Sequence, residues 1–150
     1  MPFLPRLAKI ERIMSELTPE LTELLAAAAA ARERAYCPYS RFAVGAAVRT
    51  ASGMLFSGCN IENAAYPSAI CAERVALFGA YAAGERAIVA LAVIADTPEP
   101  VSPCGGCRQV IFELAPRAVV LLANLQGAWR IVSVEELLPA GFTFDRLSEP

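Results

Sequence analysis

The sequence predicts an α/β fold built on a mixed sheet. Strand-like apolar segments alternate along the chain with segments of helical length, which is the pattern of an α/β layer fold. Two of the strand-like segments flank a short turn, and the antiparallel pair formed by this hairpin makes the sheet mixed. The length of 150 residues, without an internal repeat or a low-complexity linker, indicates one domain with a substantial core. We expect that domain to span residues 18–150, after a loosely held N-terminal tail at residues 1–17.

The first predicted helix begins at Thr18, which is a suitable N-cap residue. Pro19 favours the first helical turn and Glu20 adds an early acidic residue, so the helix is expected to run through the alanine-rich block to about Arg34. The segment CPYS then interrupts it. The segments FAVGAAV and MLFSGCNI are typical of strands, and the turn TASG between them predicts a β-hairpin.

The remaining elements continue the alternation of helices and strands. The mostly apolar segment AICAERVALFGAYAAG predicts a helix that Gly84 ends, and AIVALAVIAD is a continuous apolar run typical of a strand covered on both faces. PCGGCRQVIFELA predicts a second apolar helix. AVVLLANL and WRIVSV predict two further strands, and VEELLPAGF predicts a short helix followed by a tail.

The composition indicates more apolar surface than one small core needs. Apolar residues, counted as AVILMFWYC, make up 56% of the chain, whereas about 45–50% is usual even when glycine is included. Part of the excess is the alanine run from Ala26 to Ala31. Because a monomer seldom exposes large apolar patches to water, the rest predicts burial between subunits, and we expect a homo-oligomer.

The charge balance disfavours a polymeric nucleic-acid partner, because a net charge of −2 and a pI near 5.2 give no basic footprint for a phosphate backbone. Prolines and charges interrupt any signal-peptide core near the N-terminus, and no apolar run approaches the about 18 residues that a membrane span needs. We therefore expect a cytoplasmic protein without a membrane partner. There, the five cysteines are expected to be thiols and metal ligands rather than disulfides.

Two of these cysteines, Cys104 and Cys107, lie three positions apart at the start of the second apolar helix. Side chains at i and i+3 share a helix face with Cβ atoms about 5–6 Å apart, from which two sulfurs reach the roughly 3.8 Å separation of tetrahedral zinc ligands. Taken alone, the motif is as consistent with a redox dithiol or two buried cysteines as it is with a zinc site. The chain contains no histidine, so further metal ligands must be of another type.

Cys71, in the segment CAER, is the best candidate for a third ligand, and Glu73 follows two positions later. If Cys71 begins a helix, both side chains lean over its N-terminus, where the macrodipole and the unpaired N–H groups favour a thiolate. Three protein ligands are typical of a catalytic zinc and four of a structural zinc. Cys59 is an alternative fourth ligand, but it falls in a strand-to-loop segment, so we interpret Cys37 and Cys59 as packing residues.

The segments CAERVA and PCGGCRQV resemble the zinc signature of the cytidine deaminases, with cysteine where the general signature has histidine. Cysteine there is a feature of the short, homotetrameric members. CPYSRFAVGAAV, GCNIENAAYPSAICAER and LLPAGF extend the resemblance over about residues 20 to 142. Blasticidin-S deaminases share the CAE and PCGxCR framework but are a weaker match. The resemblance implies a cytidine deaminase-like fold with three α/β/α layers around a central mixed five-stranded sheet.

The resemblance also implies a reaction. It is the zinc-dependent hydrolytic deamination of cytidine and 2′-deoxycytidine to uridine and 2′-deoxyuridine with release of ammonia, a step of pyrimidine salvage. Cys71, Cys104 and Cys107 would bind one Zn²⁺ per subunit, which activates a water molecule. Glu73 would be the catalytic residue that moves the proton of this water to the pyrimidine and later to the departing amine.

Further residues are expected around the zinc and the substrate. Arg74 would offset the negative charge of three thiolates by donating hydrogen bonds to sulfur, and Arg108 is a second candidate for this role. The substrate-binding candidates that the resemblance implies are Asn60 and Glu62 at the sugar, Phe42 and Ala72 at the base, Tyr66 as a further contact, and Phe142, whose ring would reach the site of a neighbouring subunit in a homotetramer. Without the resemblance, these would be ordinary helix, turn and core residues.

Four rival interpretations remain open. A non-catalytic, zinc-stabilised binding module would require Cys59 as a fourth ligand. A thiol oxidoreductase would use Cys104 and Cys107 and would leave Cys71 and Glu73 without a role. Polynucleotide editing shares the chemistry of deamination but needs a basic surface. A deaminase of a cytosine nucleoside analogue, of the blasticidin-S type, is a further alternative.

Overall fold

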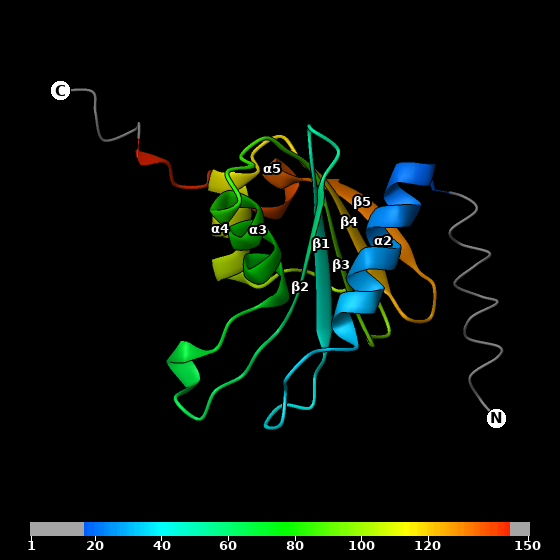
Figure 1. Cartoon of the computed structure of the whole chain (residues 1–150), viewed down its shortest axis with the longest axis vertical. Coiled ribbons are helices and arrows are strands. Elements are labelled where there is room, and N and C mark those ends of the chain that lie inside the picture. The colour runs from blue at the N-terminus through cyan, green and yellow to red at the C-terminus, as the bar shows by residue number, and fades with distance from the viewer. Residues whose placement is uncertain (1–16, 145–150) are drawn as a thin grey trace.

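The computed structural model describes residues 17–144 and shows a five-stranded sheet with the strand order β2-β1-β3-β4-β5 (Figure 1). β1 is antiparallel to β2 and to β3, β3 and β4 are parallel, and β4 and β5 are antiparallel. These pairings confirm the predicted hairpin and the mixed sheet. The strands are β1 (Val44–Thr50), β2 (Leu55–Cys59), β3 (Ile88–Ala95), β4 (Val119–Asn124) and β5 (Trp129–Ser133).

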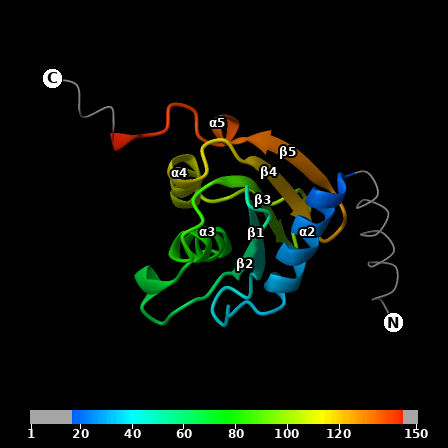
Figure 2. The same ribbon diagram turned by 45° about the horizontal axis from the view of Figure 1, so that its top comes forward.

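The helices cover both faces of this sheet, which confirms the three predicted layers (Figures 1 and 2). One apolar core lies between the sheet and α2, and the other lies between the sheet and α3, α4 and α5. β3 is almost entirely buried, as its apolar run predicts. The helices are α2 (Pro19–Arg32), the 3-10 helix η1 (Tyr66–Ser68), α3 (Ala72–Ala82), α4 (Gly105–Leu114) and α5 (Val134–Leu137).

The ends of the helices follow the sequence signals closely. Thr18 caps α2, because its side chain accepts a hydrogen bond from the N–H of Leu21 at 3.3 Å. α2 ends at Arg32, slightly before the expected Arg34. Gly84 follows α3 with a φ of 84°, the left-handed conformation that commonly ends a helix. The 3-10 helix η1 was not predicted, and the first 16 residues of the expected tail lie outside the described residues.

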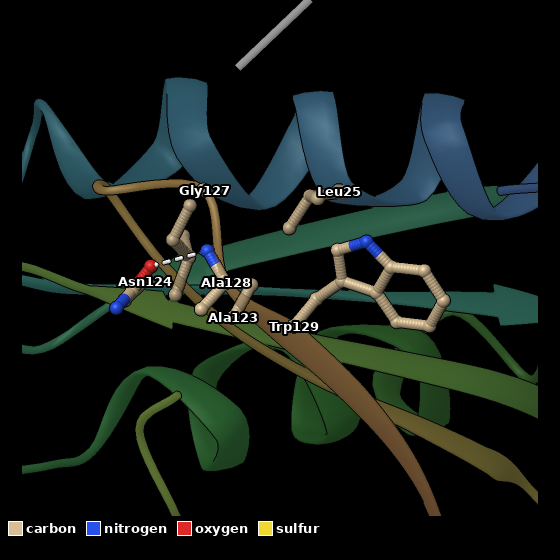
Figure 3. A pocket seen from close by; sticks show the side chains of 7 residues that line it. Leu25, Ala123, Asn124, Gly127, Ala128 and Trp129 are labelled. Atoms are coloured by element: carbon tan, nitrogen blue, oxygen red, sulfur yellow. Dashed lines mark hydrogen bonds between the residues drawn. The ribbon is translucent and has the colours of Figure 1, made fainter. Parts of the chain in front are cut away.

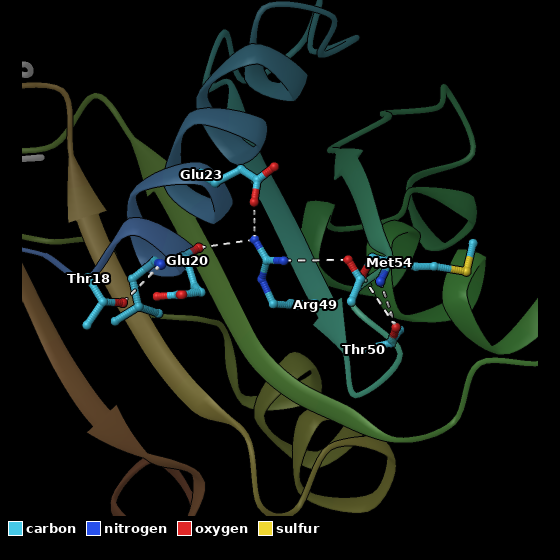
Figure 4. Close-up of polar contacts among 8 residues, drawn as sticks. Thr18, Glu20, Glu23, Arg49, Thr50 and Met54 are labelled. Atoms are coloured by element: carbon cyan, nitrogen blue, oxygen red, sulfur yellow. Dashed lines mark hydrogen bonds and ion pairs between the residues drawn. The ribbon is translucent and has the colours of Figure 1, made fainter.

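Arg49 attaches the start of α2 to the β-hairpin (Figure 4). Its guanidinium forms an ion pair with Glu23 and donates a hydrogen bond to the backbone oxygen of Glu20 at 3.3 Å. A further hydrogen bond of 3.5 Å goes to the backbone oxygen of Gly53 in the hairpin turn. These contacts hold α2 across the first strand, so this layer is connected to the sheet by polar as well as apolar contacts.

Asn124, at the end of β4, holds the loop that follows β3. Its side-chain amide donates hydrogen bonds to the backbone oxygens of Thr97 and Pro98, each at 2.9 Å, and its Oδ1 accepts from the N–H of Ala128 at 2.7 Å (Figure 3). Asn124 is buried beside a small cavity of about 10 Å³ that Leu25 of α2 also lines. Because this loop leads to α4, its attachment helps to place the start of that helix.

Within residues 17–144, no helix combines the length and the apolar content needed to cross a membrane.

Candidate active site

The starts of α3 and α4 meet because of the direction of two strands. β2 and β3 run the same way, since each is antiparallel to β1. α3 follows β2 and α4 follows β3, and both helices pack on the same face of the sheet. Both helices therefore begin at the same edge. Cys71 is the N-cap residue of α3 and Cys104 is the N-cap residue of α4, as the sequence predicts.

Gly58 of β2 allows α3 to lie directly against the sheet. A Cβ atom on Gly58 would lie 2.7 Å from the backbone oxygen of Ala72 and 2.7 Å from the backbone nitrogen of Ala76, which is closer than real Cβ contacts. Only glycine therefore fits between β2 and the first turns of α3. Sequence reasoning missed this residue, although a glycine inside a strand pattern is a known signal of close backbone approach.

Three sulfur atoms gather where the two helices begin. The Sγ atoms of Cys71 and Cys104 are 4.0 Å apart, and with the Sγ of Cys107 they form a group whose members all lie within 4.8 Å of one another. Tetrahedral zinc with Zn–S bonds of about 2.3 Å needs sulfurs roughly 3.8 Å apart, so the donor set fits zinc. Cys59, at the end of β2, is not a member of this group.

Hydrogen bonds to sulfur favour a thiolate at Cys71. The pKa of Cys71 is lowered to about 5, first by a hydrogen bond with Cys107 and also by the guanidinium of Arg74, while burial opposes this shift. The Nη2 atom of Arg74 lies 3.4 Å from the Cys71 sulfur. The pKa of Cys107 is raised, first by the hydrogen bond to Cys71 and then by burial. Arg74 thus lies where the sequence predicts it, within reach of the sulfurs.

Glu73 is the one acidic residue that is buried among residues 17–144, with 5% of its surface exposed. Burial raises the pKa of its carboxyl group to about 7, and the neighbouring Cys71 adds to the rise while Arg74 opposes it. Glu73 lies in the first turn of α3 and lines the same pocket as Cys71 and Cys104. The structure therefore brings together the predicted acid and two of the predicted metal ligands.

This pocket has a volume of about 260 Å³, close to the lower end of the range for small-molecule sites, about 300–1,000 Å³. It includes four predicted substrate contacts, Phe42, Asn60, Glu62 and Ala72. Four residues of its wall were not predicted as contacts, Ser40, Val44, Val101 and Ser102, because only the packing of distant segments places them there. The complete lining is Ser40, Phe42, Val44, Asn60, Glu62, Cys71, Ala72, Glu73, Val101, Ser102 and Cys104.

Asn60 fixes the loop that enters β1. Its Oδ1 accepts a hydrogen bond from the N–H of Val44 at 2.8 Å, and its Nδ2 donates to the backbone oxygen of Phe42 at 2.7 Å. An amide oxygen has two lone pairs and an amide nitrogen has two donors. One acceptor site and one donor of Asn60 therefore remain for a ligand.

Glu62 fixes the tip of the same loop. Its carboxylate accepts from the N–H of Tyr39 at 2.9 Å and from the N–H of Ser40 at 3.3 Å. Hydrogen bonding by Ser40 is the main cause that lowers the pKa of the Glu62 carboxyl, and the N–H of Tyr39 contributes. An ionised carboxylate has about four acceptor sites, so Glu62 retains the capacity to accept from a ligand.

Two predicted contacts do not line this pocket. Tyr66 lies in η1 with 71% of its surface exposed, and its ring centroid is 5.8 Å from that of Tyr39, over a neighbouring depression of about 240 Å³. Phe142 is 53% exposed, and its backbone oxygen accepts a hydrogen bond from Gln109 of α4 at 2.9 Å. Neither residue is part of the wall that Cys71 and Cys104 share.

Arg108 was a candidate for donating to the sulfurs, but the structure directs it elsewhere. Its guanidinium donates to the backbone oxygens of Pro103 and Leu137 and to the hydroxyl of Ser102. Each of the three guanidinium nitrogens donates to an oxygen atom, so the proximity of Arg108 to Cys107 in the sequence does not decide its partners.

Comparisons with known proteins agree with this arrangement. Residues 19–123 match the model of the cytidine and deoxycytidylate deaminase zinc-binding region. A cytidine deaminase of Halalkalibacterium halodurans is 53% identical over 127 residues, which cover 84% of this chain and 96% of that protein. A relative of the same name in Sporosarcina psychrophila is 49% identical over 130 residues, 86% of this chain and 96% of that protein. The matched region contains all three cysteines of the sulfur group, Cys71, Cys104 and Cys107.

Solved structures show the same fold. The crystal structure of a cytidine deaminase from Burkholderia pseudomallei is 53% identical, with a TM-score of 0.78, and the alignment covers 80% of this chain and 97% of that one. A cytidine deaminase from Mycobacterium tuberculosis is 34% identical, with a TM-score of 0.71 and coverage of 83% and 98%. By sequence and by fold, over most of its length, this chain belongs to the zinc-binding cytidine and deoxycytidylate deaminase family.

Proposed function

We propose that this protein hydrolyses cytidine and 2′-deoxycytidine to uridine and 2′-deoxyuridine. Water supplies the oxygen that replaces the exocyclic amine at C4, and ammonia leaves. The observation that carries this proposal is a group of three cysteine sulfurs, two of which, those of Cys71 and Cys104, line one pocket together with the buried acid Glu73. The relatives and the solved structures that the chain resembles are named cytidine deaminases, which supports the same reaction.

Cys71, Cys104 and Cys107 would hold one Zn²⁺ per subunit. Zinc in such a site lowers the pKa of water, so that a nucleophile is available near neutral pH. Three protein ligands are the number found in catalytic zinc sites, whereas structural sites use four. Arg74 offsets the charge of the thiolates through its hydrogen bond to Cys71.

Glu73 is the proposed general acid and base. Its position in the first turn of α3, two residues after a metal ligand, places the carboxyl group in the wall of the pocket. There it takes a proton from the attacking water, passes it to N3 of the pyrimidine and later protonates the departing amine. One side chain thus carries the protons of both halves of the reaction.

The pocket wall supports a nucleoside rather than a nucleotide. The described residues that line the pocket and the neighbouring depression include Glu62 and Glu73 but no lysine or arginine. A phosphate group would therefore meet negative charge without a positive partner. Glu62 can accept from a ribose hydroxyl and Asn60 has a free donor and acceptor site, while Phe42 and Ala72 border the base. Deoxycytidylate, the other substrate in the name of the family, is disfavoured.

We further propose a homotetramer in which Phe142 completes a neighbouring site. Several large apolar side chains near the loops of the pocket are exposed in the single chain, and burial between subunits would remove them from water. Phe142 is exposed and does not line the pocket of its own chain, so its ring is available to another subunit. The exposed side chains beside the pocket loops are Tyr36, Tyr39, Phe42, Ile61 and Tyr66.

Ammonia release tests the proposed reaction directly. Purified protein with measured zinc content is incubated with cytidine, 2′-deoxycytidine, deoxycytidylate and free cytosine. We expect turnover of both nucleosides, little or none of the nucleotide, and about one zinc per subunit, as three thiolate ligands imply. Zinc-loaded protein that releases no ammonia from either nucleoside would contradict the proposal.

A further inference from the structure

Arg108, in the first turns of α4, contacts three separate parts of the chain. Its Nε donates to the backbone oxygen of Pro103 at 2.9 Å, its Nη2 donates to the hydroxyl of Ser102 at 2.8 Å, and its Nη1 donates to the backbone oxygen of Leu137 at 3.0 Å. Its own N–H donates to the backbone oxygen of Cys104 at 2.9 Å. The side chain therefore turns back over the start of the helix that carries two metal ligands.

Two of these contacts fix the peptide that precedes Cys104. The carbonyl of Pro103 belongs to the peptide bond whose nitrogen is that of Cys104, and Ser102 lines the pocket. Cys104 is exposed, whereas Cys107 is fully buried. Packing can hold the sulfur of Cys107 in place, but Cys104 lies at the surface, so its position depends more strongly on hydrogen bonds to the preceding backbone.

The third contact joins the same unit to the C-terminal segment. Leu137 is the last residue of α5, which lies beside α4 (Figure 2). The next residue of α4, Gln109, donates to the backbone oxygen of Phe142 at 2.9 Å. Gly141 packs so closely on the ring of Phe112 that a Cβ atom would lie 2.8 Å from it. The segment from Leu137 to Phe142 thus lies along α4, and Arg108 holds its first residue.

We propose that Arg108 is a positioning residue that holds Cys104 in its metal-binding place by joining the loop at Ser102 and Pro103 to the end of α5. This inference rests on the proposed zinc site. The planar guanidinium of arginine presents donors in fixed directions, so it can serve three acceptors that lie on different sides. A lysine ammonium has the same charge but lacks this fork, and its single nitrogen cannot reach all three oxygens together.

Zinc release tests the inference without using the activity of the enzyme. The holoenzyme and the variants R108Q and R108K are mixed with a chromogenic chelator, and the rate of zinc transfer is followed. We expect both variants to release zinc about 10- to 100-fold faster, because loss of contacts that orient a ligand has effects of this size. R117Q removes the same charge from an exposed arginine that follows α4, and it should release zinc at the unchanged rate.

Cobalt-substituted protein provides a spectroscopic check on geometry. The visible absorption of Co²⁺ reports the arrangement of its ligands, so R108Q and R108K should alter the spectrum while R117Q leaves it unchanged. Thermal unfolding of the zinc-free proteins is measured in parallel, and if R108Q does not fold, R108K carries the test. Unchanged zinc release and an unchanged cobalt spectrum in R108Q, or wild-type behaviour in R108K, would overturn the inference.

These readouts also separate the inference from the proposed reaction. If wild-type protein did not deaminate cytidine but R108Q still released zinc faster, the role of Arg108 would stand and the proposed substrate would not. If cytidine were deaminated but zinc release were the same in R108Q and R117Q, the proposed reaction would stand and the role of Arg108 would not.

Discussion

The sulfur atoms of Cys71 and Cys104 lie 4.0 Å apart, although 33 positions separate the two residues in the chain. Each is the N-cap residue of a different helix, and neither helix could bring the other sulfur close by itself. The proposed metal site is thus a junction between two supersecondary units. The site can form only if the sheet has this strand order and these strand directions.

Replacement of Cys104 by serine should remove most of the bound zinc, because the hydroxyl is a far weaker zinc ligand than a thiolate. Metal analysis after gel filtration measures the loss. Cys59→Ser is the matched control, since Cys59 is not a member of the sulfur group, and it should keep both zinc and activity. Loss of zinc in Cys59→Ser would instead indicate a closed four-cysteine site.

Glu73→Gln should keep its zinc and lose turnover by about 10²- to 10⁴-fold, the usual contribution of a general acid or base. The amide has nearly the same shape but cannot carry the proton, so kcat should fall. Steady-state kinetics together with metal content measure the two effects. Glu135→Gln, at an exposed position in α5, is the control. Near-normal turnover in Glu73→Gln would remove this residue from the proposed role.

Gly58→Ala should destabilise the protein by about 1–3 kcal/mol, as overpacking of a tight contact does. The new methyl group would lie 2.7 Å from backbone atoms of α3 and would push the first turn of that helix away from β2. Gly79→Ala is a good control, because its Cβ would meet nothing closer than 3.9 Å and alanine favours a helix. Chemical denaturation compares the two, and equal stability would contradict the close approach at Gly58.

The loop at Tyr39 and Ser40 should loosen when Glu62 is protonated. The pKa of Glu62 in the folded protein lies below its ordinary value of 4.5, chiefly through hydrogen bonding by Ser40. Its stabilising contribution is therefore fully present above pH 4.5 and is lost as the pH falls through the lowered pKa. Amide exchange of Tyr39 and Ser40 measures this, and Glu62→Gln should show no such pH dependence. Identical pH profiles would exclude the proposed bond between carboxylate and loop.

Phe142→Ala should impair catalysis through a neighbouring subunit. If the ring acts in trans, a mixture of Phe142→Ala and Glu73→Gln subunits should regain activity, because an intact Glu73 can then meet an intact Phe142. Phe78→Ala is the control, since Phe78 is an exposed ring of α3, with 42% of its surface exposed, that does not line the pocket. Light scattering establishes the oligomeric state. A stable monomer with full activity would contradict the proposal.

The chain order of helices and strands could be predicted because its signals are local. Thr18 caps α2, Cys71 and Cys104 begin their helices, and Gly84 follows the end of α3. Each signal depends on residues within one or two turns, where backbone hydrogen bonds and side-chain spacing decide the structure. The pairing of Cys104 with Cys107 is of the same kind, since both lie in one helical turn.

Other features depend on contacts between distant segments. Asn60 and Glu62 were predicted at the sugar, but their side chains also hold the loop from Tyr39 to Val44. The guanidinium of Arg108 donates hydrogen bonds to oxygen atoms rather than to sulfur. No spacing rule predicts these partners, because the loops that supply them are placed by the sheet and by neighbouring helices.

The sequence by itself determined the chemical identity of the site: which thiols, which acid and which helix starts carry them. Only the tertiary structure decided that these groups meet, because β2 and β3 must run in the same direction for α3 and α4 to begin at one edge. Strand direction and the close approach at Gly58 are properties of the packed sheet. They arise because the helices bury both faces of the sheet. The free energy of this burial depends on many distant residues together, so no local segment determines it.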